Sequence, residues 1–400
     1  MVPVVRSTVL AVVAVILAVP AQAYRFSDGL EAYAYAQVWA TVYEQLEEAD
    51  ALHQFPSGDL GVTETTGLSV HQVRAGLDYL LIDDRVGLHV QLKLERNPAL
   101  LNAFASFHVA RCLRVQVGQQ KIPTTYEGLV LSRDLDFAHR SQLTRVSADY
   151  ALSRGVHTSS LFYGNRSYYR DLGVALKGDV DLGHGGFRYF AMAGNGLGAN
   201  LYIGGSSERQ YILTNGPQLF YGLRLELYDW FDVVTVGAHA SLNKHDNMVF
   251  NSGRVVYDLD RLSYSADLRL RIPVLGLRLA GLAGGGRIDD DYDNDGRADL
   301  LYEGWDLRLL WSVRDSLGTL LPASLTADHD LQLAARYDWY QSQWNEVGSL
   351  VSQQEITVGV NYLYKDLVRL MLDAIWRQTD EPGLPDLADD GVLLSLQISI

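Results

Sequence analysis

The sequence contains a single cysteine, Cys112, so no internal disulfide can stabilise the fold. Beyond residue 23 it also lacks any stretch that approaches the roughly 18 continuous apolar residues of a membrane-spanning helix. Basic residues are outnumbered, with 33 Lys and Arg against 48 Asp and Glu, which gives a net charge of -15. This balance argues against nucleic-acid binding, which requires a basic surface.

The first 23 residues have the pattern of an export signal. Arg6 precedes an apolar run at residues 9–19, and residues 20–23 (Pro-Ala-Gln-Ala) provide the small side chains of a cleavage site. A membrane anchor is the weaker interpretation because the apolar run is short and the cleavage site follows at once. We therefore predict a signal peptide at residues 1–23 and a single mature domain at residues 24–400.

The mature chain is rich in alternation with a period of two residues. In residues 221–227, Leu and Tyr side chains alternate with Gly, Arg and Glu, and the same period of two persists to residues 394–400. Short polar turns and longer loops separate these stretches alternately, and residues 244–259 are expected to form one of the long loops. Residues 315–329 are an exception, since a short turn is expected there. The pattern predicts about 16 antiparallel strands.

Two features favour a membrane barrel over a soluble sandwich, whose strands alternate as well. The polar faces carry charges of both signs in mid-strand, as a water-filled lumen would allow. Aromatic side chains gather near strand ends on the apolar face, as at Trp230, Trp339 and Tyr362. We predict an all-β fold, a transmembrane antiparallel β-barrel in the outer membrane of a Gram-negative-type bacterium.

One connection stands apart from the others. Residues 113–119 alternate strictly, a long polar and aromatic segment follows at residues 121–168, and alternation resumes at residue 171. A strand that leads into a loop of this length is typical of a pore wall with an inserted loop. We expect this connection, the third outer loop, to constrict the pore.

The motifs around this loop carry a family resemblance. The segment V-G-Q-Q-K-I-P at residues 117–123, followed by S-R-D-L-D-F at residues 132–137, resembles the phosphate-selective porin O and P family. The resemblance implies a trimeric outer-membrane channel whose third outer loop folds inward and whose basic side chains conduct anions. By match to the motifs, Lys121 and Arg133 are the family positions that carry over.

Further basic residues are expected to line the pore. A few fixed charges in a narrow aqueous passage between low-dielectric walls outweigh many acids on outer loops. The alternative is that Arg133 pairs with Asp134 and only braces the loop. The additional candidates in the loop are Arg140, Arg145 and Arg154, and those on the wall strands are Arg114, Arg224, Arg269 and Arg308.

The chain departs from the family in two places. The family's phosphate specificity depends on a dense lysine cluster, whereas this loop offers one lysine, Lys121. The chain also ends in Ile400, where an aromatic residue is usual for outer-membrane barrels. The first departure leaves open whether phosphate is preferred over other anions.

A second motif lies in a predicted outer loop. Asp291, Asp293, Asp295 and Asp299 have the spacing of a calcium-binding loop, and Gly296 permits its sharp turn. The acidic end-ligand and flanking helices of an EF-hand are missing, so the segment resembles the strand-flanked calcium loops of extracellular proteins. A structural Ca²⁺ site is predicted here, with an acidic solvated loop as the alternative. No other cofactor is expected.

The sequence thus predicts a porin for passive diffusion of small hydrophilic solutes, with anions such as phosphate as the expected cargo. The expected partners are membrane lipid, lipopolysaccharide and two further copies of the chain. A barrel enzyme is disfavoured, because His239 and Ser241 share a strand face without an acid to orient the histidine. The alternative to a porin is a closed-barrel adhesin or structural protein of the outer membrane.

Overall fold

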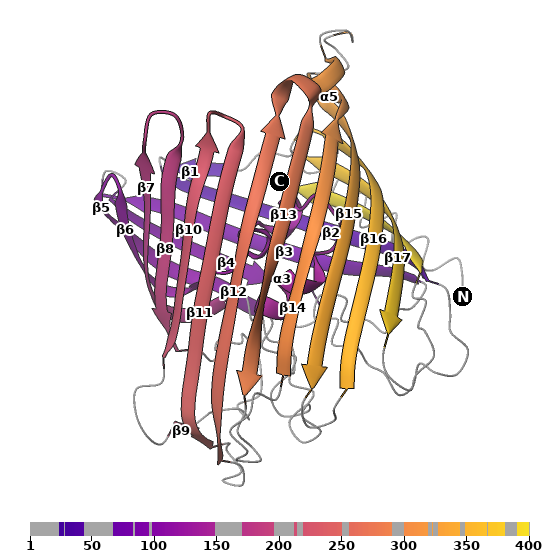
Figure 1. Ribbon diagram of the computed structural model, residues 1–400. Coiled ribbons are helices and arrows are strands. Elements are labelled where there is room, and N and C mark those ends of the chain that lie inside the picture. The colour runs from indigo at the N-terminus through magenta and orange to yellow at the C-terminus, as the bar shows by residue number, and fades with distance from the viewer. Residues whose placement is uncertain are drawn as a thin grey trace, which may run out of the picture.

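The computed structural model describes residues 24–27, 29–43, 67–82, 85–95, 98–148, 170–195, 212–213, 219–249, 256–289, 300–318, 322, 327–344, 349–365, 367–380 and 390–399. Within these ranges the chain forms one antiparallel sheet of 18 strands that closes on itself (Figure 1). Two of the strands are short: β1 (Tyr24–Ser27) pairs with the first wall strand, and β9 (Ile212–Leu213) pairs with β11. The other sixteen form the closed wall, which confirms the predicted barrel and strand number.

The wall strands follow one another in chain order, and the ring is closed by pairing of β18 with β2 and of β8 with β10. The wall consists of β2 (Leu30–Tyr43), β3 (Gly67–Leu81), β4 (Val86–Lys93), β5 (Ala99–Ala110), β6 (Leu113–Lys121), β7 (Arg170–Asp181), β8 (Gly186–Gly194), β10 (Phe220–Trp230), β11 (Val234–Val249), β12 (Val256–Ile272), β13 (Leu277–Asp289), β14 (Leu300–Ser312), β15 (His329–Trp344), β16 (Ser349–Tyr364), β17 (Val368–Asp380) and β18 (Gly391–Ser399).

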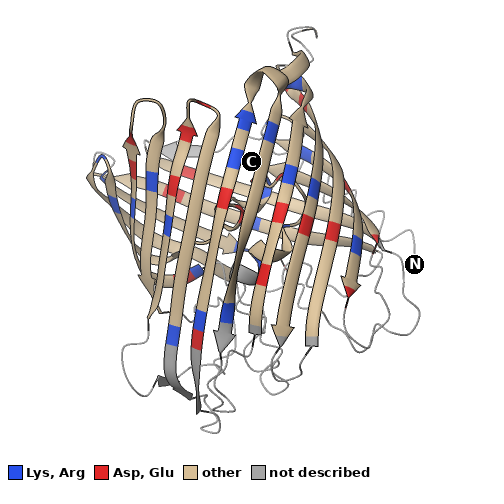
Figure 2. Cartoon of the chain, in the orientation of Figure 1, with Lys and Arg blue, Asp and Glu red and all other residues tan. Residues whose placement is uncertain are grey.

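Alternation gives each strand one lipid-facing and one lumen-facing side. On β10, Leu223 and Leu225 are exposed on the outer surface, whereas Arg224 and Glu226 between them are buried inside the barrel. Lys, Arg, Asp and Glu accordingly recur along the middle of the strands and not only at their ends (Figure 2). The outer face is apolar because the hydrocarbon of a bilayer, and not water, is its solvent.

Tight turns join the strands at one end of the barrel (Figure 1). The predicted long loop at residues 244–259 is wrong in extent, because the β11–β12 ladder continues to the pair Val249↔Val256. A short helix, α5 (Val313–Leu317), includes the first residues of the exceptional segment at 315–329, and at its start the Ser312 hydroxyl accepts a hydrogen bond from the Asp315 amide at 3.1 Å. A 3-10 turn, η4 (Pro273–Leu275), closes the β12–β13 turn beside it.

The connection between β6 and β7, residues 122–169, is the third loop, and the structure describes it as far as residue 148. It contains α2 (Tyr126–Leu129), η2 (Ser132–Asp134) and α3 (Gln142–Ala148). Gly118 lies near the end of β6, just before this loop. Its φ of +132° favours glycine, and a Cβ at this position would meet the Ala103 carbonyl oxygen at 2.2 Å. None of the helices in the described parts of the chain is long and apolar enough to cross a membrane.

Candidate functional site

The third loop lies inside the barrel, and its first turn is fixed by Lys121. The Lys121 ammonium donates to the carbonyl oxygens of Gly128, Leu129 and Val130 at 3.0, 2.8 and 2.8 Å. These carbonyls lie at the C-terminal end of α2, where a cation is favoured. At the other end of α2, the Thr125 hydroxyl accepts a hydrogen bond from the Gly128 amide at 3.1 Å.

The loop then contacts the opposite wall through a buried ion pair. Glu127 of α2 binds Arg308 of β14, with 2.7 Å between Oε1 and Nη1, and Arg308 also binds Asp306 of the same strand at 2.6 Å. The Ser141 amide and hydroxyl donate to the other Glu127 oxygen at 3.0 and 2.9 Å. Burial opposes ionisation of Glu127, but the Arg308 and Arg336 guanidiniums outweigh it and lower the pKa of Glu127 to about 2.

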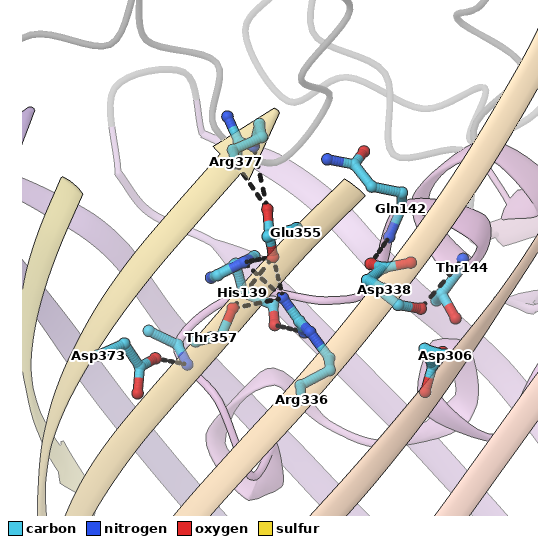
Figure 3. Close-up of polar contacts among 12 residues, drawn as sticks. His139, Gln142, Thr144, Asp306, Arg336, Asp338, Glu355, Thr357, Asp373 and Arg377 are labelled. Carbon is cyan, nitrogen blue, oxygen red and sulfur yellow. Dashed lines mark hydrogen bonds and ion pairs between the residues drawn. The ribbon is translucent and has the colours of Figure 1, made fainter. Parts of the chain in front are cut away.

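A second contact forms around Glu355 of β16 (Figure 3). Its Oε1 lies 2.8 Å from His139 Nε2 of the loop and 2.6 Å from Arg336 Nη2 of β15, while its Oε2 accepts from Arg377 Nη2 of β17 at 2.8 Å. The side chains of His139, Arg336 and Glu355 are fully buried. Burial lowers the pKa of His139 to about 4, although Glu355 acts in the opposite direction. We refer to these four residues as the anchoring cluster.

Carboxylates of the same wall accept hydrogen bonds from the backbone amides of the loop. The Ala138 amide donates to Asp373 at 2.9 Å and the Gln142 amide donates to Asp338 at 2.6 Å (Figure 3). Phe137, from the S-R-D-L-D-F motif, packs against Leu310 and Ala334 of the wall and is 1% exposed. Polar and apolar contacts therefore fix the described part of the loop against strands β14–β17.

The opposite side of the lumen remains open as a cavity of about 800 Å³, which we call the vestibule. It extends from α2 of the third loop to the tight-turn end of the barrel, where Arg85 and Arg111 occupy turns. Among the described residues that line it, the only carboxylates are Asp179 and Glu226. The lining cations are Arg85, Arg111, Arg114, Lys121, Lys177, Arg188, Arg224 and Arg269.

Three of these arginines are compensated by acids. Arg224 binds Glu226 at 3.0 Å and Asp267 at 2.7 Å, and Arg188 binds Glu226 at 2.9 Å. Arg269 shares the same two acids, Glu226 and Asp267. Arg188 also binds Asp179 of β7 at 3.2 Å, so three arginines face three acids and this group is close to electrically neutral.

The remaining cations leave a positive surface. Arg114 of β6 and Lys177 of β7 are direct cross-strand partners, and neither forms an ion pair with a residue that the structure describes. Like charges directly opposite one another destabilise a sheet. The Lys177 ammonium lies 3.9 Å from the centre of the Phe190 ring, an attraction that offsets part of this repulsion. Positive charge is thus retained here at a cost to stability.

The predicted site residues fall into two groups. Lys121, Arg114, Arg224 and Arg269 line the vestibule. The others do not line it. Arg133 is half-buried beside Asp134 at 3.5 Å, and Arg145 is buried in α3. Arg308 is buried in its ion pair with Glu127, Arg140 is buried against the carbonyl oxygens of Glu127 and Val130, and Arg154 lies outside the described residues.

Four vestibule cations were not among the predicted site residues: Arg85, Arg111, Lys177 and Arg188. The signal for Lys177 was present, because it has the opposite parity to Val174 and Leu176 and so faces the lumen. Arg85 and Arg111 belong to turns, where alternation gives no parity. The calcium motif at residues 291–299 lies outside the described residues, and within the described ones no group of three or more His, Cys, Asp or Glu side chains is placed to hold a metal.

The family model for phosphate-selective porin O and P matches residues 292–399. Over its last strands, the chain matches that porin family. This agrees with the family suggested by the motifs at residues 117–123 and 132–137, which lie in a different part of the sequence. No curated protein matches the chain.

Solved structures of outer-membrane proteins share the fold. The trimer form of OmpT from Vibrio cholerae has a TM-score of 0.54 at 12% identity and covers 93% of this chain and 99% of its own. OmpF of Salmonella typhi, in complex with daunomycin, has a TM-score of 0.53 at 11% identity, with 93% and 97% covered. The channel DcaP of Acinetobacter baumannii has a TM-score of 0.52 at 10% identity, with 94% and 99% covered.

The porin family match and the sixteen-stranded barrel agree on the location of the protein. In fold the chain is an outer-membrane barrel of the Gram-negative type, as predicted from its sequence. The family match also supports the coarse function of a porin, a channel for small solutes.

Proposed function

We propose that this protein is a passive porin that favours small hydrophilic anions, phosphate among them, over cations. The observation that carries the proposal is the pair of Arg114 and Lys177 on the vestibule wall, which no described carboxylate compensates. A positive surface in a narrow aqueous passage raises the local concentration of anions and lowers that of cations.

The net charge of the chain, -15, does not oppose this proposal. Interactions between exposed charges are screened within about 10 Å at 0.1 M salt, so distant acids contribute little inside the lumen. Only two carboxylates line the vestibule in the described part of the chain. The local charge, and not the total charge, governs which ion enters.

We propose no strict preference for phosphate over other small anions. Of the two lysines in the lining, Lys121 gives its three donors to backbone carbonyls and so supports the loop. Lys177 and the arginines present positive charge without an arrangement dedicated to a tetrahedral oxyanion. We therefore assign selectivity by charge, with phosphate as one of several anions.

We propose a homotrimer embedded in outer-membrane lipid and lipopolysaccharide, by analogy with the trimer form of OmpT. We propose diffusion without covalent chemistry, since His239 is buried and bonded to Ser265 at 2.7 Å. A structural Ca²⁺ ion at Asp291, Asp293, Asp295 and Asp299 is also retained as a proposal.

The test is the reversal potential of the purified protein in a planar bilayer under a potassium chloride gradient. Anion selectivity is the expected result. A cation-selective potential would contradict the proposal and show that acidic loops govern the field. A folded barrel without conductance would instead favour the closed adhesin or structural protein.

A further inference from the structure

The vestibule is lined by apolar side chains as well as by charges. Three half-buried residues of the third loop, Tyr126, Leu129 and Val130, form part of its lining, and Phe190 of β8 lines it from the wall. The lumen of a porin is normally polar, so an apolar surface inside it is unusual. We call these four side chains the apolar face of the vestibule.

The apolar face is the edge of a buried cluster inside the lumen. Phe190 packs with Ile122, Met192 and Phe220, each of which is at most 4% exposed. Leu129 of α2 packs against the same cluster from the loop. These contacts hold Phe190 and Leu129 in place, so the apolar face is a fixed part of the vestibule.

The uncompensated cations lie directly beside this surface. Lys177 is the cross-strand partner of Phe190, and its ammonium lies 3.9 Å from the centre of the ring. One lumen-facing step further along the same two strands, roughly 7 Å away, Ala175 pairs with Met192 of the buried cluster. Arg114, on the other side of Lys177, is exposed to the vestibule. A single small molecule can therefore contact both the positive charge and the apolar face.

The size of the vestibule is suited to an organic ligand. Its volume of about 800 Å³ lies within the range of about 300–1,000 Å³ that is typical of small-molecule pockets. Such pockets combine apolar and aromatic side chains with a few polar groups that orient the ligand. A hydrated inorganic anion interacts only with the cations, whereas a carboxylate with an apolar body can interact with both surfaces.

We propose, on the basis of the anion-selective porin described above, that the vestibule preferentially binds small organic anions with an apolar body, aromatic carboxylates in particular. Arg114 and Lys177 hold the carboxylate, and the apolar face contacts the body. A channel must also release what it binds. The half-buried side chains of the third loop meet this condition, because they remove only part of the ligand from water.

The first test compares ligands that share either the charge or the apolar body. Binding of sodium benzoate, sodium acetate and benzyl alcohol to the wild-type barrel in detergent is measured by titration calorimetry, and a titration of micelles alone is subtracted. Benzoate should bind at least about tenfold more tightly than acetate, because its ring leaves water on binding. Benzyl alcohol, which has the ring without the charge, should bind more weakly than benzoate by a similar factor. Equal affinities for benzoate and acetate would overturn the proposal.

The second test uses variants that separate the two halves of the site. Leu129→Ala should weaken benzoate binding at least about threefold and leave acetate binding unchanged, because it removes apolar surface and no charge. Leu131→Ala is the matched control: Leu131 is a half-buried leucine of the same loop that does not line the vestibule. Arg114→Gln should weaken the binding of both anions. An equal effect of Leu129→Ala and Leu131→Ala on benzoate would contradict the assignment of the apolar face.

The third test locates the ligand. Crystals of the wild-type protein soaked in sodium 4-bromobenzoate should show an anomalous bromine peak beside Leu129 and Val130, with the carboxylate towards Arg114 and Lys177. A bromine peak only outside the vestibule, or none at all, would overturn the proposal.

The outcomes separate this inference from the proposed function. The reversal potential reports on charge selectivity, whereas the titrations do not require conductance. An anion-selective channel that binds benzoate and acetate equally would overturn only the preference for an apolar body. A cation-selective channel would contradict the proposed function, and the titrations would still decide whether the vestibule binds organic anions.

Discussion

Substitution of Glu355 by Gln tests whether the anchoring cluster stabilises the protein as its geometry implies. Glu355 is fully buried and accepts from Arg336 at 2.6 Å and Arg377 at 2.8 Å. Without its charge, two buried guanidiniums lose the carboxylate that they share. Breaking a buried ion pair by removal of one partner costs about 3–5 kcal/mol. We expect Glu355→Gln to lower the free energy of unfolding by that amount.

The assay is denaturant unfolding of the refolded barrel, followed by tryptophan fluorescence. Asp328→Asn is the matched control, because its ion pair with Lys365 spans 3.5 Å between side chains that are each about half exposed. Such surface pairs contribute at most about 1 kcal/mol. If Glu355→Gln is no more destabilising than Asp328→Asn, the third loop is not anchored through Glu355 and the reasoning fails.

Three further predictions concern the loop and the vestibule. Lys121→Met should free the end of α2 and make the third loop more sensitive to protease than in the wild type, whereas Lys365→Met should not. The contribution of His139 to stability should fall as pH decreases from about 6.5 towards 4, because the unfolded chain takes up a proton that folded His139, with its pKa lowered to about 4, does not. Unfolding experiments over this pH range should therefore show a larger loss of stability in the wild type than in His139→Gln, and equal losses would contradict the prediction. The thiol of Cys112 is exposed and follows the vestibule residue Arg111 in the chain. Because positive charge attracts anions, this thiol should react faster with an anionic than with a cationic methanethiosulfonate, when each rate is divided by the rate for free cysteine. Cys112→Ser should abolish labelling.

The barrel was predictable because alternation depends only on local sequence. Leu223 and Leu225 face lipid and Arg224 faces the lumen in any antiparallel barrel, whatever its neighbours are. The entry of the third loop was predictable from the motif around Lys121 and from the length of the segment that follows. The extent of the β11–β12 ladder was not, since polar residues in an outer loop and in a strand that extends beyond the membrane look alike.

The charge state of the lumen could not be predicted from the sequence. Arg308 and Lys177 both face inward by parity, yet Arg308 is paired with Glu127, a residue 181 positions away, whereas Lys177 lies opposite Arg114. Which cation meets an acid depends on the path of the third loop and on the register of β6 with β7. Neither is fixed by local pattern, because a connection of 48 residues separates the two strands.

The charge-reversed double variant Arg114→Glu/Lys177→Glu tests the central claim most directly. The measurement is its reversal potential in a planar bilayer under a potassium chloride gradient, beside that of the wild type. One unit charge about 5 Å from a passing ion in water contributes about 0.8 kcal/mol, or roughly a fourfold change in its local concentration. Two reversals should therefore move the channel from anion to cation preference. An unchanged reversal potential would show that ions do not pass this surface and would contradict the account.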